Sequence, residues 1–151
     1  MEEILKIIPM RRDHVDAVYA IELGSFSIPW TKGEFYRELG SEHAVYLAAS
    51  LGGEIVGYAG MWHIVNEGHI TNVAVREDCR GQGVGGALVA GLLREAAKLG
   101  MIGVTLEVRA GNARAQALYS KFGFRPEGIR KNYYSDVRED AIIMWKYLSE
   151  A

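Results

Sequence analysis

The sequence has little cysteine, no long apolar run and no excess of charge of one sign. Its one cysteine, Cys79, excludes an internal disulfide and a metal site built from several thiolates, and it is compatible with a reducing cytoplasm. No apolar segment is long enough to cross a bilayer, and the acidic start MEEILKII does not have the form of a signal peptide. A formal net charge of -2 gives no reason to expect binding to nucleic acid or to an anionic membrane.

The composition is that of an ordinary globular protein. Of the 151 residues, 49% are hydrophobic and 24% are charged, enough to build a substantial core and cover it. No repeat, linker or low-complexity stretch interrupts the chain. We therefore expect a single domain over residues 1–151.

Apolar periodicity and turn residues predict alternating strands and helices. Strands are expected over 4–8, 44–50, 54–64, 69–75, 103–109 and 141–148. Helices are expected from Asp13, from Thr31 to Gly40, from Val84 to Gly100 and over 112–122, with Asp13, Thr31 and Asn112 as candidate caps. Gly52 and Gly53 indicate a hairpin between two of the strands. The order predicts an α/β fold whose sheet is mixed rather than all parallel.

A glycine cluster follows the strand at 69–75 and opens a helix, which is where a backbone can hold a phosphate. The helix dipole and free N–H groups attract an anion, and side chains larger than hydrogen would block its approach. Arg80 adds a positive charge, and with Gly83 and Gly85 it forms the pattern R-x-x-G-x-G. Four glycines within residues 81–86 are costly unless something approaches this backbone.

Two other phosphate loops fit less well. A P-loop needs Lys followed by Ser or Thr after its last glycine, but Gly86 is followed by the letters AL. Gly81, Gly83 and Gly86 satisfy the dinucleotide pattern G-x-G-x-x-G, and Glu107 lies about 20 residues further on. However, residues 76–80 separate the first glycine from the strand, and too little chain follows for a doubly wound sheet. The dinucleotide interpretation therefore stays a disfavoured alternative.

The R-x-x-G-x-G loop resembles the acetyl-CoA loop of the GNAT acetyltransferases. The stretches GSFSIPWT, TLEVRAGNARAQALYSKFGFRPEGIRKNYY and REDAIIMW are similar to family members that acetylate the N-terminal alanine of a small-subunit ribosomal protein. The resemblance covers most of the chain. It implies a mostly antiparallel twisted sheet of about seven strands with about four helices, splayed between the fourth and fifth strands. It also implies acetyl-CoA as co-substrate, no metal, and a protein N-terminus as partner.

The resemblance assigns the acetyl-CoA site to two stretches of backbone and one side chain. Backbone near Val73, Ala74 and Val75 would bind the pantetheine arm as an added strand does. The pyrophosphate would lie on the loop and the helix start, formed by Arg80, Gly81, Gln82, Gly83, Val84, Gly85 and Gly86. Asn112 would contact the arm of CoA, although its position is also that of an ordinary N-cap.

The resemblance also implies a catalytic pair, with Glu107 as general base and Tyr119 as general acid. Taken alone, a glutamate on the polar face of a strand is usually solvated, and a tyrosine at this helical spacing usually packs in a core. The surrounding motif favours the functional roles. The implied reaction is direct attack of an amine on the thioester, with backbone N–H at a strand bulge near Val75 polarising the carbonyl.

The acceptor side of the site is less specified by the sequence. Trp30, Tyr133 and Tyr134 are candidate walls of a peptide site, and are equally plausible in a core. Glu67 is a candidate contact for the substrate amine. Together with His63 and His69 it could suggest a metal site, but strand alternation would scatter the three ligands, so no metal is expected.

Several functions remain open on the sequence alone. Cys79 has no evident base partner and is expected to be a bystander rather than an acyl-carrying nucleophile. Other protein N-termini, a lysine or a small amine could be the acceptor. A protein that binds CoA without turnover is a second alternative, and an NAD-dependent oxidoreductase is a third. The sequence does not specify an oligomeric state.

Overall fold

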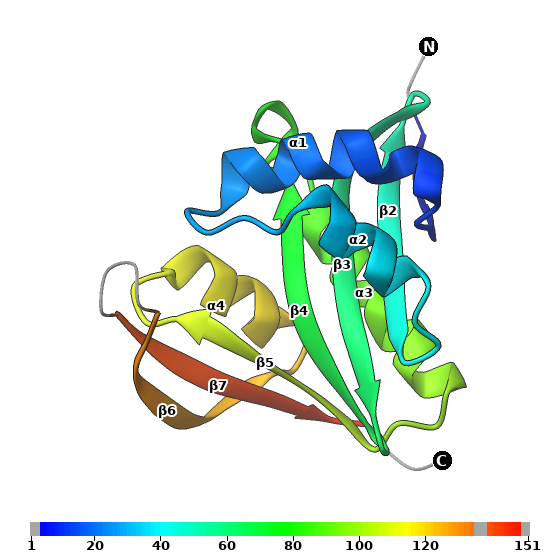
Figure 1. Ribbon diagram of the computed structural model, residues 1–151. Coiled ribbons are helices and arrows are strands. Elements are labelled where there is room, and N and C mark those ends of the chain that lie inside the picture. Colours follow the sequence, from blue (N-terminus) through cyan, green and yellow to red (C-terminus); the bar gives the residue numbers. More distant parts are fainter. Residues whose placement is uncertain (1–3, 135–138, 149–151) are drawn as a thin grey trace.

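The computed structural model describes residues 4–134 and 139–148, which form one seven-stranded sheet with helices on both faces (Figure 1). The strand order is β1-β2-β3-β4-β5-β7-β6, and only β4 and β5 pair in parallel. The strands are β1 (Leu5–Pro9), β2 (Ala44–Leu51), β3 (Glu54–Ile64), β4 (Glu67–Val75), β5 (Gly103–Arg109), β6 (Arg125–Tyr134) and β7 (Glu139–Tyr147). The helices are α1 (Val15–Ser25), α2 (Lys32–Leu39), α3 (Val84–Lys98) and α4 (Ala113–Lys121), with 3-10 turns at Arg12–His14 and Glu77–Cys79. The mixed α/β sheet predicted from the sequence is confirmed.

Most element boundaries follow from local sequence signals. The Thr31 side chain accepts a hydrogen bond from the Glu34 N–H, as a capping residue should. Gly52 and Gly53 both take positive φ in the β2–β3 turn. The prediction of Asp13 as a cap is wrong, because α1 begins at Val15 and the Asp13 carboxylate is bonded to the Arg11 side chain instead.

The apolar pattern of the sequence does not predict strand β6. All of its residues are exposed or half-buried, so the strand lacks the apolar alternation that marks a buried face. The similar stretch REDAIIMW starts at residue 138, which lies outside the described residues, and its remainder opens β7.

The core has two parts, one on each face of the sheet. Leu88 and Leu92 of α3 pack on one face together with Leu106 of β5. Val18 of α1 and Phe35 of α2 pack on the other face. Within the described residues, no helix combines the length and apolar character needed to cross a bilayer.

Strands β4 and β5 separate along their length, and this separation creates the site. They pair only where Glu67, Gly68 and His69 meet Gly103, Val104 and Thr105. Figure 1 shows the two strands meeting at one end and diverging toward the other. The splay implied by the family resemblance is confirmed, and it leaves part of β4 without a partner strand on this side.

Candidate functional site

A pocket of about 580 Å³ lies where β4 and β5 diverge. Its walls come from β4, β5, α4, the end of β6 and the segment between α1 and α2. Among the residues predicted from the sequence, it brings together Val73, Glu107, Asn112, Tyr119, Tyr133 and Tyr134. Asn112 is at the same time the N-cap of α4, accepting a hydrogen bond from the Ala115 N–H at 3.1 Å. Residues far apart in the chain therefore share one concave surface.

Glu107 lies on the polar face of β5, with the alternation that the sequence predicted. Its side chain is 11% exposed. One carboxylate oxygen, Oε2, is 2.7 Å from Nε2 of His69, and the other, Oε1, is 3.5 Å from Nε of Arg130. The hydrogen bond to His69 lowers the pKa of Glu107 below its ordinary value against the opposing effect of burial, and Arg130 adds to this. Glu107 is therefore ionised at neutral pH.

The sequence did not identify His69 as the partner of Glu107. The two residues are 38 positions apart, and their contact depends on the short parallel register of β4 with β5, in which His69 is opposite Thr105. A histidine and a glutamate on adjoining strands are a usable signal only once that register is known. The sequence suggests His69 only as a metal ligand, and within the described residues no group of three His, Cys, Asp or Glu could hold a metal ion.

Tyr119 reaches the same pocket from α4. It is 8% exposed and packs edge-on against Phe124, with ring centroids 5.8 Å apart. Burial raises the pKa of Tyr119 to about 12, so its hydroxyl stays protonated at neutral pH. Among the described residues none forms a hydrogen bond with this hydroxyl, so the proton is available to a bound molecule. The role of general acid remains a prediction that this geometry allows.

The bulge of β4 lies at Thr71. Gly60 of β3 is opposite Asn72, and the next residue, Met61, is opposite Ile70, so Thr71 is the extra residue. The prediction of a bulge near Val75 is wrong in position. Bulges bend a strand and disturb its pairing, and this one lies just beyond the last β4 residue that pairs with β5.

Beyond the bulge, successive residues of β4 direct their backbone N–H and carbonyl groups alternately toward β3 and toward the opening between β4 and β5. The Arg76 N–H donates to the Val56 carbonyl at 2.7 Å, so in antiparallel pairing Ala74 also directs its backbone groups to β3. Val73 and Val75 consequently direct theirs toward the opening between β4 and β5. Of the three residues predicted to bind the pantetheine arm through backbone, two face the opening and Ala74 does not.

The start of α3 offers unoccupied N–H groups. Its N-cap is Gly83, with φ of 85° and no side-chain cap, and Gly81 also needs a positive φ of 78°. A Cβ on Gly83 would meet nothing within 4 Å, so the space above it is open. Gly86 differs from Gly83 in its surroundings, since a Cβ there would lie in ordinary van der Waals contact with the Phe122 ring at 3.6 Å. The open amides and the helix dipole fit a pyrophosphate.

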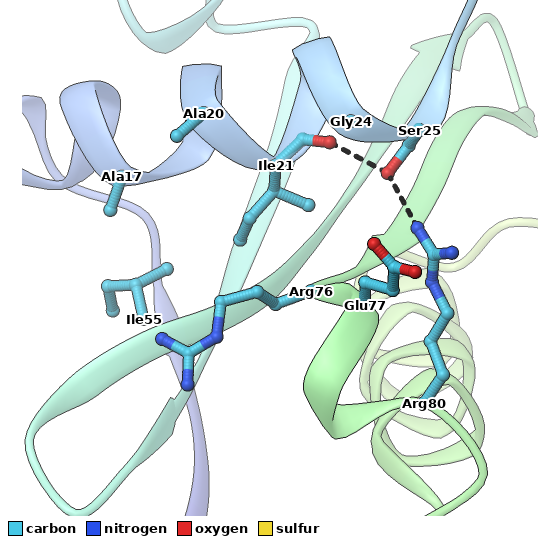
Figure 2. Close-up of a pocket in the computed structure, with 9 residues that line it drawn as sticks. All are labelled: Ala17, Ala20, Ile21, Gly24, Ser25, Ile55, Arg76, Glu77 and Arg80. Carbon is cyan, nitrogen blue, oxygen red and sulfur yellow. Dashed lines mark hydrogen bonds between the residues drawn. The ribbon is translucent and has the colours of Figure 1, made fainter.

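Arg80 ties this loop to its neighbours. Its Nε donates to the Val75 carbonyl at 2.9 Å, and an Nη donates to the Ser25 hydroxyl at 3.3 Å. Figure 2 shows Ser25 between the guanidinium of Arg80 and the Ile21 carbonyl of α1. Arg80 and Arg76 also line a second, smaller pocket of about 330 Å³ beside α1. Contact of Arg80 with a pyrophosphate stays a prediction.

Two of the predicted acceptor-side residues do not line the larger pocket. The Trp30 ring packs against Phe35 and Tyr46, with centroids 5.3 and 6.3 Å away. Glu67 is opposite Gly103, four residues before Glu107 on β5, or roughly 13 Å along the strand. Tyr133 and Tyr134 do line the pocket.

Comparison with known proteins agrees with this architecture. The model of the acetyltransferase (GNAT) family matches residues 15–124, well over half of the chain. A protein of Bacillus subtilis (strain 168), provisionally named a [ribosomal protein bS18]-alanine N-acetyltransferase, is 44% identical over 93% of this chain and 94% of its own length. The N-alpha-acetyltransferase RimI of Mycobacterium tuberculosis (strain ATCC 25618 / H37Rv) is 38% identical over 77% of this chain and 74% of its own.

A solved structure extends the agreement to three dimensions. The crystal structure of the ribosomal-protein-S18-alanine N-acetyltransferase from Escherichia coli superposes with a TM-score of 0.90 and 35% sequence identity, covering 98% of this chain and 96% of the other. Family, relatives and fold agree. The chain belongs to the GNAT family of acetyltransferases.

Proposed function

We propose that this protein transfers the acetyl group of acetyl-CoA to the N-terminal amine of a protein, specifically the N-terminal alanine of a small-subunit ribosomal protein of the bS18 type in the cytoplasm. The observation that carries the proposal is the pocket that Glu107 and Tyr119 both line, beside the open backbone of β4. The names of the relatives from Bacillus subtilis and Escherichia coli support the choice of substrate.

Acetyl-CoA supplies the acetyl thioester. The N–H groups at the start of α3, from Gly83 to Gly86, would hold its pyrophosphate. Backbone groups of Val73 and Val75 would bind the arm as an added strand does, and Asn112 lines the same path. The two tyrosines at the end of β6, Tyr133 and Tyr134, would contact the acceptor peptide.

Glu107 removes the proton that the amine loses as the C–N bond forms and the C–S bond breaks, directly or through a water. An N-terminal amine has a pKa near 8, so about a quarter of it is neutral around pH 7.5 and little deprotonation is needed beforehand. The lowered pKa of Glu107 makes it a weak base, which passes the proton on to solvent.

Tyr119 donates a hydrogen bond to the departing sulfur. A free thiol has a pKa of about 8.5, so it is a stronger acid than the Tyr119 hydroxyl with its pKa of about 12. The thiolate can therefore leave on that hydrogen bond and take a proton later. A backbone N–H facing the opening, from Val73 or Val75, would polarise the carbonyl during attack.

The test is release of free CoA with acetyl-CoA and a short peptide starting with alanine. Peptides that differ only at the first residue measure selectivity, and the same peptide with a blocked N-terminus is the control. Equal rates on all first residues would favour a broader N-terminal acetyltransferase. Tight acetyl-CoA binding without turnover on any peptide would refute the proposal and favour a CoA-binding protein.

A further inference from the structure

A second buried glutamate, Glu22, lies on α1, outside the pocket just described. It is 1% exposed. Its Oε2 accepts a hydrogen bond from the Trp30 N–H at 2.8 Å, and Oε1 accepts from the Tyr58 hydroxyl and, at 3.5 Å, from the Asn72 amide. These partners are neutral, and burial raises the pKa of Glu22. A buried carboxylate without a cation is expensive to keep, so it calls for an explanation other than stability.

Two of the partners of Glu22 belong to segments that contribute residues to the pocket walls. Asn72 lines the pocket from β4 and accepts a hydrogen bond from Thr71, the bulge residue, at 2.7 Å. Trp30 lies near the end of the segment 26–31, which joins α1 to α2 without regular structure. Glu22 therefore links this segment to the bulged part of β4.

The linked segment presents apolar side chains at the rim of the pocket. Phe26, Ser27 and Ile28 line it, and Phe26 and Ile28 are 37% and 66% exposed. The segment is fixed at its beginning by a hydrogen bond from the Phe26 N–H to the Glu22 carbonyl, and near its end by the Glu22 side chain. Exposed apolar side chains that line a pocket together offer a surface for a bound molecule.

We infer that Glu22 is a positioning residue for the acceptor peptide: it holds segment 26–31 against β4, so that Phe26 and Ile28 form the wall met by the first residues of the peptide. This inference rests on the proposed function. The Glu22 carboxylate accepts from the Trp30 N–H of the segment and from the Asn72 amide beside the bulge at once, which an apolar side chain of similar size cannot do.

The test compares Glu22→Leu and Glu22→Gln with wild type, using Glu34→Gln as control. Glu34 lies on α2 close enough to act electrostatically on Glu22, but its side chain makes no hydrogen bond to the segment. Glu22→Leu should raise the KM for the peptide roughly tenfold, the scale of losing hydrogen bonds to a charged group. Glu22→Gln keeps one acceptor and should raise it less. The kcat and the KM for acetyl-CoA should change by less than about twofold in both.

Two outcomes separate this inference from the proposed function. Turnover by wild type together with an unchanged peptide KM in Glu22→Leu would overturn the inference alone, as would parallel changes in kcat and both KM values. Absence of wild-type turnover on every peptide would overturn the proposed function. Hydrogen exchange checks the fold of Glu22→Leu: exchange should accelerate in segment 26–31 and stay slow in the sheet.

Discussion

The surroundings of Glu107 and Glu22 differ more than the residues do. Both carboxylates are largely buried, and both lie close to the pocket between β4 and β5. Glu107 has a histidine and an arginine beside it, and its pKa is lowered. Glu22 has only neutral hydrogen-bond donors as partners, and burial raises its pKa. The comparison teaches that the neighbouring groups decide whether the ionised form of a buried carboxyl is stabilised or destabilised.

The largest effect is expected from Glu107→Gln. Glutamine keeps the size and a hydrogen-bond acceptor but cannot take the proton, so kcat/KM should fall by about 10²–10⁴. Steady-state CoA release on an alanine peptide measures this. Glu95→Gln on α3, a half-buried residue that does not line the pocket, should behave as wild type. A fall in kcat/KM of less than tenfold would show that Glu107 is not the general base, and its functional difference from Glu22 would disappear.

Tyr119→Phe should lower kcat less, by roughly 10- to 100-fold, because the hydroxyl supplies a hydrogen bond to a thiolate that can leave unprotonated. The KM for acetyl-CoA should stay nearly unchanged, since the ring still packs on Phe124. With a pKa of about 12, Tyr119 should cause no fall in wild-type rate up to about pH 10. A basic limb near pH 9 that disappears in Tyr119→Phe would contradict this assignment.

His69→Phe tests why the two glutamates titrate differently. Removing the 2.7 Å hydrogen bond should raise the pKa of Glu107, so the acid limb of kcat/KM should move to higher pH. We expect a loss of activity that is largest at low pH and shrinks as the pH rises. Arg130→Gln should shift the limb in the same direction by less, because Arg130 is further away. Equal shifts in both variants would show that simple charge, and not the hydrogen bond, sets this pKa.

The smallest expected effect is on the free energy of unfolding. The loss of stability should depend on pH in opposite directions at the two glutamates. A carboxyl whose pKa is raised in the folded state stabilises the fold below its unfolded pKa, and this contribution disappears as the pH rises. Glu22→Gln should therefore lose least stability at pH 7 and most near pH 4. A lowered pKa stabilises at neutral pH and loses this as pH falls, so Glu107→Gln should cost most at pH 7. Changes of about 1 kcal/mol in unfolding free energy, measured with urea, are expected. The same pH trend in both variants would remove the contrast.

The sequence predicted much of the fold because its signals are local. Thr31, Asn112 and the glycines at 52 and 53 cap or turn the chain through contacts within a few residues. The apolar pattern does not predict strand β6 because none of its residues is buried. Glu107 and Tyr119 are candidates only through their motif, since neither a strand glutamate nor a helical tyrosine is unusual by itself.

By itself, the sequence determined where strands and helices form, and it placed glycine at the two loop positions that need positive φ, Gly81 and Gly83. It also determined which face of β5 carries Glu107. Only the tertiary structure decided that His69 meets Glu107 across 38 residues, and that Glu22 meets Asn72 across 50. Those contacts depend on where β4 bulges and stops pairing with β5. That point is set by the packing of both sheet faces together, and no local pattern contains it.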